Sequence, residues 1–552
     1  MSDTSSSEFV ETDASEPESR RTFDVVVVGA GFAGLYMLHR LRGLGLSALV
    51  FEAAGGVGGT WFWNRYPGAR CDFESLVYSY SFSEELQQEW EWTERYPSQE
   101  EILRYLNHVA DRFDLRRDIQ LDTRVTSAVF DEATDRWQIR TNRGEQVSAR
   151  YCVMATGCLS DPYVPDIKGI DTFEGKTYHT GRWPHEEVDF SGQRVAVIGT
   201  GSTAVQAIPE IAKQASELVV LQRRPSFSMP ARNAPLSPDA QREVKADYTA
   251  HRQAARESLF GLELRVNENT PKSALQVSPE ERQREYEERW AEGGVGIMAA
   301  FADLLVNKEA NDTAADFLRG KIREIVHDPA VAELLTPTGY PFASKRLCVD
   351  SEYFETFNRD NVTLIDVKAS PIEEITPSGL RTRDAAYELD SIVFATGFDA
   401  MTGAVTSVDI QGRDGTTLRE KWADGPRTYL GLASAGFPNL FLITGPGSPS
   451  VLSNMIVSIE QHVDWIADCI AYLDGRDARR IEPTAEAEQA WVAHVAEVGG
   501  YTLFPTTDSW YMGSNVPGKA RTFMPYIGGV GAYRSKCDDV AAKDYEGFSV
   551  TV

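Results

Sequence analysis

The stretch DVVVVGAGFAGLYMLHRLRGLGLSALVFEA, residues 24–53, has the pattern of a complete strand–helix–strand unit. An apolar run leads into Gly29-x-Gly31-x-x-Gly34, an apolar helix follows, and a second strand ends at Glu52. Glycines allow a tight turn and a close approach of the backbone to a pyrophosphate, which the positive end of the helix attracts. A carboxylate at position 52 can accept hydrogen bonds from a ribose diol. The stretch therefore predicts a Rossmann-type site for FAD or NAD.

A second unit begins at Gln193 and reads QRVAVIGTGSTAVQAIPEIAKQASELVVLQRRP. Its second strand ends in Arg223-Arg224 instead of an acid. Two guanidinium groups can bind a 2'-phosphate that a carboxylate would repel, so this unit favours NADP; a solvated strand end is the alternative interpretation. The residues predicted to contact NADP in the turn and first helical turn are Gly199, Thr200, Gly201, Ser202, Thr203, Ala204, Val205 and Gln206.

Two further strand-like runs divide the chain into domains. YCVMATG at 151–157 and SIVFATGF at 391–398 both end at Ala-Thr-Gly, where small residues let backbone approach a cofactor or a neighbouring domain. They predict an α/β fold with two Rossmann-like dinucleotide-binding domains, each discontinuous in sequence. We expect an FAD-binding domain at 22–159 and 391–552, an NADP-binding domain at 166–231 and 337–390, a helical insertion in the NADP domain at 232–336, and a disordered acidic tail at 1–21.

Two Ser-Pro pairs mark helix starts inside the predicted insertion. Ser237-Pro238 and Ser278-Pro279 each supply an N-cap followed by proline at the first helical position, and Glu281 is spaced to complete a capping box. The many charges nearby are typical of a solvated helix face. A role of the insertion in shaping the substrate entrance is the alternative.

Composition narrows the class of protein. The 552 residues carry a net charge of -27, which argues against nucleic acid or an anionic membrane surface as the main partner. No apolar run reaches the ~18 residues that a membrane span needs. Six scattered cysteines form no CxxC pair, which disfavours a disulfide framework or a metal site and favours a reducing cytoplasm. We expect no obligate protein partner.

The segment after the first ribose acid limits the flavin chemistry. GGVGGTWFWNRYPGARCD, residues 55–72, contains Cys71 but no second cysteine, so dithiol exchange is excluded as the main reaction. Its part from Gly58 to Asp72 resembles the flavin-side segment of the Baeyer–Villiger monooxygenases. FEGKTYHTGRWP, residues 173–184, is similar to the fingerprint of that family. The resemblance extends from about Asp24 to the C-terminus.

The resemblance implies a reaction and its cofactors. NADPH would reduce FAD, the reduced flavin would add O2 at C4a, and the resulting peroxide anion would attack a ketone to give an ester or lactone. The ketone could be an aryl, cyclic or steroid compound, with sulfoxidation as a side reaction. Arg346 would be the catalytic cation, because arginine stays protonated, and Asp72 would orient it.

The resemblance also assigns the remaining site residues. Ser450, Val451 and Leu452 would face the ketone, and Phe173, Gly175, His179, Trp183 and Pro184 would form a hinge between the domains. The FAD contacts would come from Gly59, Thr60, Trp61, Phe62, Trp63, Asp72, Tyr78, Val125 and Met455. The further NADP contacts would come from Arg70, Cys71, Asp72, Arg223, Arg224, Lys345, Arg346 and Trp510, the last on a lid.

Three residues depart from what the family leads us to expect. Ala204 replaces a glycine without endangering NADP binding, Arg224 replaces a small polar residue and should strengthen the preference for NADPH, and Val451 is bulkier than alanine. Two other functions stay open. One is oxygenation of sulfur or nitrogen by the same flavin chemistry. The other is an NADPH-binding flavoprotein that senses redox state without oxygenating a substrate.

Overall fold

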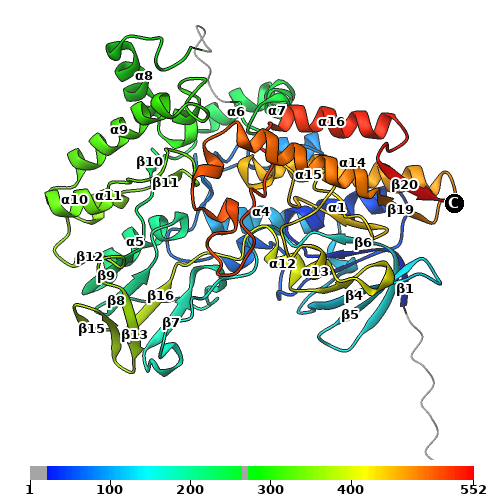
Figure 1. Ribbon diagram of the computed structural model, residues 1–552, viewed down its shortest axis with the longest axis horizontal. Helices are drawn as coiled ribbons and strands as arrows, with labels where there is room; N and C mark the ends of the chain where they lie inside the picture. The colour runs from blue at the N-terminus through cyan, green and yellow to red at the C-terminus, as the bar shows by residue number, and fades with distance from the viewer. Residues whose placement is uncertain (1–20, 264–271) are drawn as a thin grey trace, which may run out of the picture.

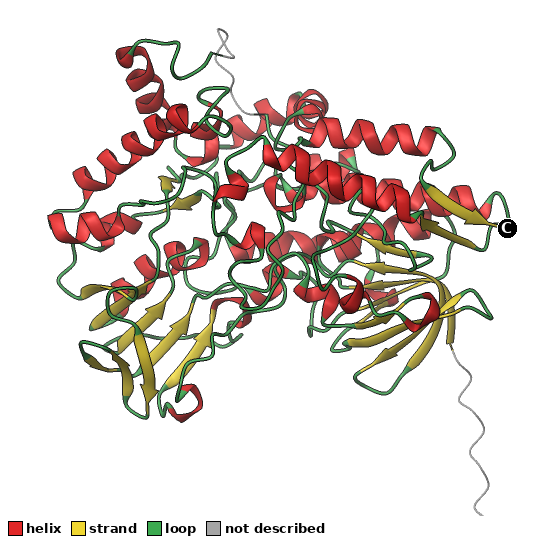
Figure 2. Cartoon of the chain, viewed as in Figure 1, coloured by secondary structure: helices red, strands yellow, loops and turns green. Residues whose placement is uncertain are grey.

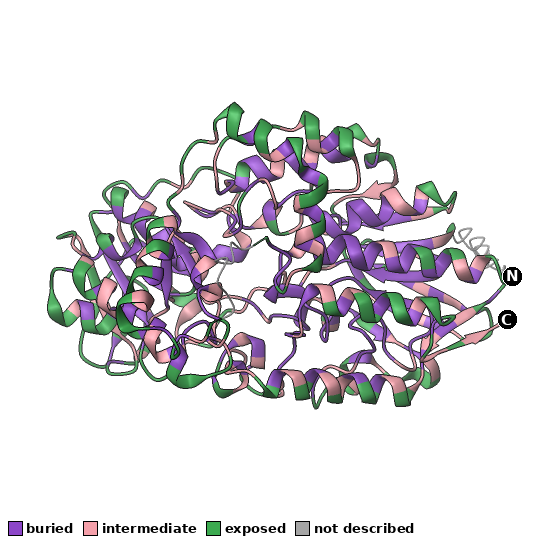
Figure 3. Cartoon of the chain, turned by 90° about the horizontal axis from the view of Figure 1, so that it is seen from above, coloured by how far each residue is buried: buried purple, intermediate pink, exposed green. Residues whose placement is uncertain are grey.

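The computed structural model describes residues 21–263 and 272–552. Two lobes stand side by side, each with its own sheet, and helices cover the upper side of both (Figure 1, Figure 2). The purple interior in Figure 3 shows that the sheet strands and the helices against them are buried. Most of the predicted tail lies outside the described residues, but Arg21 already belongs to the first strand.

The larger sheet has eight strands and contains the first glycine motif. Its parallel part runs in the order β3-β2-β1-β6, and β18 pairs with the second half of β6. The first half of β6 instead pairs antiparallel with β5, β5 pairs antiparallel with β4, and β17 lies parallel to β4 at the edge of the sheet. The strands are β1 (Arg21–Val28), β2 (Ala48–Phe51), β3 (Ile119–Gln120), β4 (Val125–Asp131), β5 (Arg136–Thr141), β6 (Gln146–Met154), β17 (Asp409–Gln411) and β18 (Leu440–Leu442).

Long helices bury one face of this sheet. The helix that follows the first glycine motif packs along a helix from the C-terminal part, and both join the largest hydrophobic cluster. The elements around this lobe are α1 (Phe32–Gly43), α2 (Thr60–Trp63), α3 (Glu84–Glu89), α4 (Gln99–Arg112), α12 (Gly403–Thr406), α13 (Leu418–Lys421), α14 (Met455–Asp474), α15 (Ala485–Gly500) and α16 (Val530–Ala542), with the hairpin β19 (Arg480–Pro483) and β20 (Phe548–Thr551).

The second sheet is fully parallel and contains the second glycine motif. Its order is β12-β9-β8-β16-β7, and α5 (Ser202–Gln214) packs on it. A three-stranded antiparallel sheet covers its other face through a shared hydrophobic cluster. The strands are β7 (Lys176–His179), β8 (Arg194–Ile198), β9 (Glu217–Gln222), β12 (Val362–Asp366), β16 (Ser391–Phe394), β13 (Ile372–Thr376), β14 (Gly379–Thr382) and β15 (Ala386–Glu388).

One predicted domain boundary is wrong. The run beginning at Ser391 was expected to open the second FAD segment, but β16 pairs with β7 and β8 in the centre of the second sheet. The chain returns to the FAD lobe only after Phe394, where Phe398 bridges Pro162 of the outgoing connection. An apolar four-residue strand fits the middle of either sheet, so its composition alone could not place it.

The predicted insertion is helical but serves both lobes. Its helices are α6 (Pro238–Ala246), α7 (Tyr248–Glu257), α8 (Pro279–Glu292), α9 (Lys308–Ile325) and α10 (Pro329–Leu335); α11 (Tyr353–Thr356) and the pair β10 (Ser228–Pro230) and β11 (Cys348–Asp350) lie beside it. Lys245 Nζ donates to the Trp90 carbonyl at 2.6 Å, and Arg252 donates to Ser79 at 2.7 Å. These contacts fix α6 and α7 to the FAD lobe.

The two predicted N-caps are confirmed. Ser237 Oγ accepts from the Ala240 N–H, and Ser278 Oγ accepts from the Glu281 N–H, each at 3.1 Å. The Glu281 carboxylate, however, pairs with Lys272 at 3.1 Å instead of completing a capping box. An ion pair within reach competes for the same carboxylate. No helix within residues 21–263 and 272–552 combines the length and the hydrophobicity that a membrane-spanning segment requires.

The packing of α1 on β1 generates a stability prediction. A Cβ added at Gly34 would lie 1.8 Å from the Gly29 carbonyl oxygen, whereas one at Gly43, the last residue of the same helix, would meet no atom of the described chain within 4 Å. We expect Gly34→Ala to destabilise the FAD lobe by at least ~2 kcal/mol and to lower FAD retention. Gly43→Ala should be neutral or stabilise by up to ~1 kcal/mol. Thermal denaturation and flavin content compare the two; equal melting temperatures would contradict the account.

Candidate functional site

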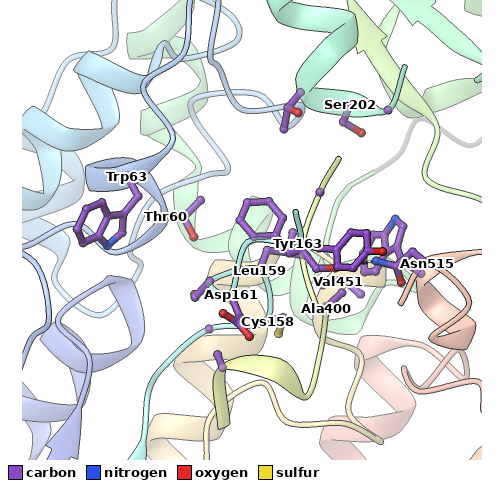
Figure 4. Close-up of a pocket in the computed structure, with 18 of the residues that line it drawn as sticks. Thr60, Trp63, Cys158, Leu159, Asp161, Tyr163, Ser202, Ala400, Val451 and Asn515 are labelled. Carbon is purple, nitrogen blue, oxygen red and sulfur yellow. Dashed lines mark hydrogen bonds between the residues drawn. The ribbon is translucent and has the colours of Figure 1, made fainter. Parts of the chain in front are cut away.

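A cavity of about 990 Å³ lies where the two lobes meet, and both glycine motifs line it. In Figure 4, Thr60 and Trp63 of the FAD lobe, Ser202 of α5, and Val451 and Asn515 of the C-terminal part all border this space. The predicted residues that line it are Gly29, Gly31, Glu52, Gly59, Thr60, Trp61, Trp63, Arg70, Cys71, Asp72, Tyr78, Val125, Gly199, Thr200, Gly201, Ser202, Thr203, Gln206, Arg223, Arg224, Lys345, Arg346, Val451, Met455 and Trp510.

Some predicted contact residues lie behind the cavity wall. Phe62 does not line the cavity; its ring packs on His185, with centroids 4.5 Å apart, and edge-on against Trp63, with centroids 5.2 Å apart. Ser450 and Leu452 flank Val451 in one 3₁₀ turn, where successive side chains point about a third of a turn apart, so one of the three faces the cavity. Gly34, Ala204 and Val205 are buried where their helices pack on the strands.

The first glycine of each motif touches an Ala-Thr-Gly strand end. A Cβ at Gly29 would lie 2.6 Å from the Ala155 carbonyl oxygen, and one at Gly199 would lie 2.4 Å from that of Ala395. Both glycines have positive φ, 106° and 117°. The missing side chain of each glycine therefore allows a close approach to the strand end of the same lobe, whereas the sequence predicts an approach of these strand ends to a cofactor or a neighbouring domain.

The residues present fit two dinucleotides. A Cβ at Gly201 would meet no atom of the described chain within 4 Å, so the missing side chain leaves open space before α5. Within the described residues, neither α1 nor α5 has a side-chain N-cap, which leaves first-turn N–H groups available to a diphosphate. Glu52 accepts from the Ala30 and Ala54 N–H groups at 2.6 and 2.8 Å, and burial raises its pKa. Its remaining lone pairs suit a ribose diol.

Arg346 and Asp72 form an ion pair on the cavity wall. Nε and Nη2 of Arg346 donate to one carboxylate oxygen of Asp72 at 3.0 and 2.7 Å, and Nη1 donates to the Val451 carbonyl at 3.0 Å. The two side chains are 22% and 21% exposed, toward the cavity. Burial alone lowers the pKa of Arg346, but Asp72 and then Tyr511 outweigh it and raise that pKa. The site thus contains an oriented, permanent cation.

A second group of cations lines the other end of the site. Lys345 lies over the Tyr340 ring at 4.1 Å, and burial together with Arg224, Arg223 and Lys368 lowers its pKa to about 8. A cluster of like charges that depresses a lysine pKa stabilises a bound anion. The arrangement suits the 2'-phosphate of NADP.

The fingerprint segment connects the lobes. His179 Nδ1 accepts from the Gly181 N–H at 2.9 Å, so the ring proton is on Nε2, which donates to the Tyr163 carbonyl at 3.2 Å. Burial lowers the pKa of His179 and keeps the ring neutral. The Trp183 N–H donates to the Trp63 carbonyl at 3.3 Å. Phe173, Gly175 and Pro184 do not line the cavity either. None of the five predicted hinge residues is therefore part of the cavity wall.

Several residues that sequence reasoning missed contribute to the site. Arg182 lies 4.5 Å over the Trp63 ring and donates to the Ser160 carbonyl. Cys158 Sγ lies 3.0 Å from Ser450 Oγ and holds the turn that carries Val451. Phe73 lies beneath the Arg346 guanidinium at 5.2 Å. Of these residues, only Arg182 could have been identified from the sequence, because it lies within the fingerprint at 173–184.

The cysteine side chains lie in the interior of the protein. All six cysteines are buried and free, and burial raises the pKa of the Cys348 thiol to about 11. Across residues 21–263 and 272–552, no three His, Cys, Asp or Glu side chains gather as a metal-binding group.

Comparison with known proteins places this arrangement in a family. A family model described as pyridine nucleotide-disulphide oxidoreductase matches residues 26–276. The chain is 46% identical over 529 residues to a Baeyer-Villiger monooxygenase of Pseudooceanicola batsensis, covering 95% of each chain. It is 45% identical over 530 residues to a phenazine N-monooxygenase of Lysobacter antibioticus, covering 95% of this chain and 96% of that one.

A solved structure agrees. "Oxidized steroid monooxygenase bound to NADP" superimposes with a TM-score of 0.92 at 55% identity, covering 96% of this chain and 99% of that one. The fold and the cavity define a flavoprotein monooxygenase with two dinucleotide-binding lobes. The chain belongs to the Baeyer–Villiger monooxygenases. The predicted family and α/β fold are therefore confirmed.

The depressed Lys345 pKa generates a prediction about pH. The free lysine loses its proton near pH 8, and a bound phosphate favours the charged form, so NADP+ affinity should fall as pH rises from 7 to 9. Lys345→Arg, which stays charged, should remove this dependence, and NAD+, which lacks the 2'-phosphate, should show little in either protein. Equilibrium titration at each pH measures the dissociation constants. A flat profile for the unaltered protein would contradict the assignment of Lys345.

Proposed function

We propose that this protein catalyses the oxidation of a ketone by O2 and NADPH to an ester or lactone, with FAD as its cofactor. One oxygen atom enters the ketone, the other leaves as water, and NADPH supplies the two electrons. Membership of the family supports this class of reaction. The Arg346–Asp72 ion pair on the cavity wall supports the assignment of Arg346 as the catalytic cation. When bound, FAD supplies the redox chemistry that takes a hydride from NADPH and activates O2.

Arg346 is the residue that meets the developing charge. Asp72 and the Val451 carbonyl hold its guanidinium from two sides, so it needs little reorganisation when negative charge grows on the ketone oxygen. Removal of one such donor typically costs about 3–4 kcal/mol of transition-state stabilisation. Val451, whose backbone orients this cation and whose side chain borders the cavity, places the ketone beside it.

Aryl, cyclic and steroid ketones are the candidate substrates. Relatives include an acetone monooxygenase and a cyclohexanone 1,2-monooxygenase, which shows that one scaffold serves ketones of different size. The expected cytoplasmic location and the lack of an obligate protein partner stay predictions. Nitrogen oxygenation is a second candidate, since the phenazine N-monooxygenase is nearly as similar to this chain as the Baeyer-Villiger relative.

Product analysis with a variant of Arg346 tests the proposal. We expect the unaltered protein to convert at least one of phenylacetone, cyclohexanone or progesterone to an ester, and Arg346→Ala to lower this rate by about 10²–10³-fold. Arg323→Ala, which removes an exposed arginine paired with Glu333, should leave the rate unchanged. Chromatography detects the products, and hydrogen peroxide release is measured in parallel.

The alternatives give different products in the same experiment. N-oxides or sulfoxides alone, from an amine or thioanisole, would transfer the assignment to heteroatom oxygenation. NADPH oxidation that yields only hydrogen peroxide with every substrate would favour the redox-sensing flavoprotein. Ester formation that survives Arg346→Ala within about tenfold would remove the assigned role of Arg346.

We also propose that residues 173–184 act as the hinge between hydride transfer and the later steps. The neutral His179 supports this, because its two hydrogen bonds tie Gly181 to the outgoing connection at Tyr163. An Asn side chain is too short to make both bonds. We expect His179→Asn to keep its FAD and its melting temperature but to slow flavin reduction by NADPH. Anaerobic stopped-flow absorbance measures that rate, and an unchanged rate would overturn the hinge role.

A further inference from the structure

The 2'-phosphate end of the cavity contains a carboxylate. Asp508 lines this region together with Arg223, Arg224, Lys345, Lys368 and Arg521. The first three of these cations were expected from the sequence, whereas Asp508 and Arg521 come from the C-terminal segment 504–522. A negative side chain among five cations is the feature that the NADPH assignment leaves unexplained.

Asp508 is bound to the same arginine that distinguishes this chain from the family pattern. Its carboxylate lies 3.5 Å from Arg224 Nη2, and its backbone carbonyl accepts from Arg224 Nη1 at 3.2 Å. Its second carboxylate oxygen pairs with Arg521. Arg224 follows shortly after the end of β9 at Gln222. Its backbone carbonyl accepts a hydrogen bond from the Thr200 hydroxyl of the glycine turn at 2.9 Å. The Asp508 carboxylate therefore already interacts with Arg224 and Arg521, whose guanidinium groups lie beside the predicted position of the 2'-phosphate.

We propose that Asp508 is an internal competitor of the NADP 2'-phosphate for Arg224, and that it sets the affinity and the 2'-phosphate selectivity of the enzyme. The inference rests on the proposed NADPH dependence. A phosphate dianion brought to Arg224 meets a carboxylate that already uses this guanidinium. Binding must then either displace the carboxylate or bear its repulsion, and both lower affinity.

The rest of the segment allows such an exchange. Lys519 pairs with Asp399, Asn515 Nδ2 donates to the Phe398 carbonyl at 2.7 Å, and Thr507 Oγ1 lies 2.6 Å from Ser344 Oγ. These contacts hold the segment when Asp508 leaves Arg224. Arg521 continues to pair with Asp508, so the exchange leaves no charge without a partner.

The size of the effect follows from exposure. The side chains of Arg224, Asp508 and Arg521 are 37%, 45% and 57% exposed, so solvent and salt screen their interactions. An exposed ion pair alters an equilibrium by up to about fivefold. The competition should therefore be modest at physiological salt and larger at low ionic strength.

Binding titrations of the FAD-loaded enzyme test the inference without turnover. The probes are NADP+, NAD+, and the fragments adenosine 2'-monophosphate and adenosine 5'-monophosphate. We expect Asp508→Asn to tighten NADP+ and the 2'-monophosphate by about three- to fivefold at low salt, and by less in 0.5 M NaCl. NAD+ and the 5'-monophosphate should change less than twofold.

Two further variants separate competition from a looser segment. Asp399→Asn removes a carboxylate that anchors the same segment through Lys519, and it should not change the ratio of NADP+ to NAD+ affinity. Introduced into Arg224→Ala, Asp508→Asn should lose most of its effect, because the shared donor is gone.

Each outcome has one meaning. Weaker or unchanged NADP+ binding by Asp508→Asn, or an equal gain for NAD+, overturns the competition. A full gain that persists in the Arg224→Ala background overturns the role of Arg224. If the unaltered enzyme itself binds NADP+ and NAD+ equally well, the proposed NADPH dependence fails instead.

Discussion

The Arg346 guanidinium joins three segments of chain that are far apart in sequence. It follows the helical insertion, pairs with Asp72 of the FAD lobe, and donates to the Val451 carbonyl of the C-terminal part. A largely buried cation of this kind is stable only while its hydrogen-bond acceptors stay in place. The position of the lobes, the turn that carries Val451 and the orientation of the guanidinium are therefore coupled to one another. Cys158 and Phe73 act on the same constraint, from behind the turn and from beneath the guanidinium.

The chain crosses between the lobes at Ala155 and Ala395, and these crossings explain why the nucleotide sites face each other. Each crossing carbonyl lies against the first glycine of a motif, so the strand end that leaves a lobe also shapes its phosphate turn. His179 hydrogen-bonds across the outgoing connection, and Thr396 Oγ1 lies 3.3 Å from its Nε2. The hydrogen bonds of His179 and the two phosphate turns therefore depend on the same two connections between the lobes. This coupling fits an enzyme in which hydride passes between two bound dinucleotides.

Local patterns predicted much of this protein because dinucleotide binding uses contiguous residues. The two glycine motifs, Glu52 and Arg223 were identifiable by spacing alone, and the resemblance added Asp72 and Arg346. The failures share a physical cause. The sheet that contains Ser391–Phe394 is decided by neighbours about 200 residues away, and the directions of Phe62, Ser450 and Leu452 are decided within single turns whose packing has no sequence signature. The pairing of Arg224 with Asp508 spans 284 positions and is visible only in three dimensions.

The charge distribution gives a reason for a carboxylate at the phosphate end. A chain with a net charge of -27 repels polyanions in general, so selectivity for NADP requires a local excess of cations. Screening limits their reach to about 8 Å at physiological ionic strength, which makes Arg223, Arg224 and Lys345 act only on a bound ligand. Such a cluster binds product NADP+ and NADPH equally firmly, because both carry the same 2'-phosphate, and tight binding slows the release of the product. An internal anion on a separately anchored segment weakens both equally and shortens the residence of the product, a benefit wherever release limits turnover.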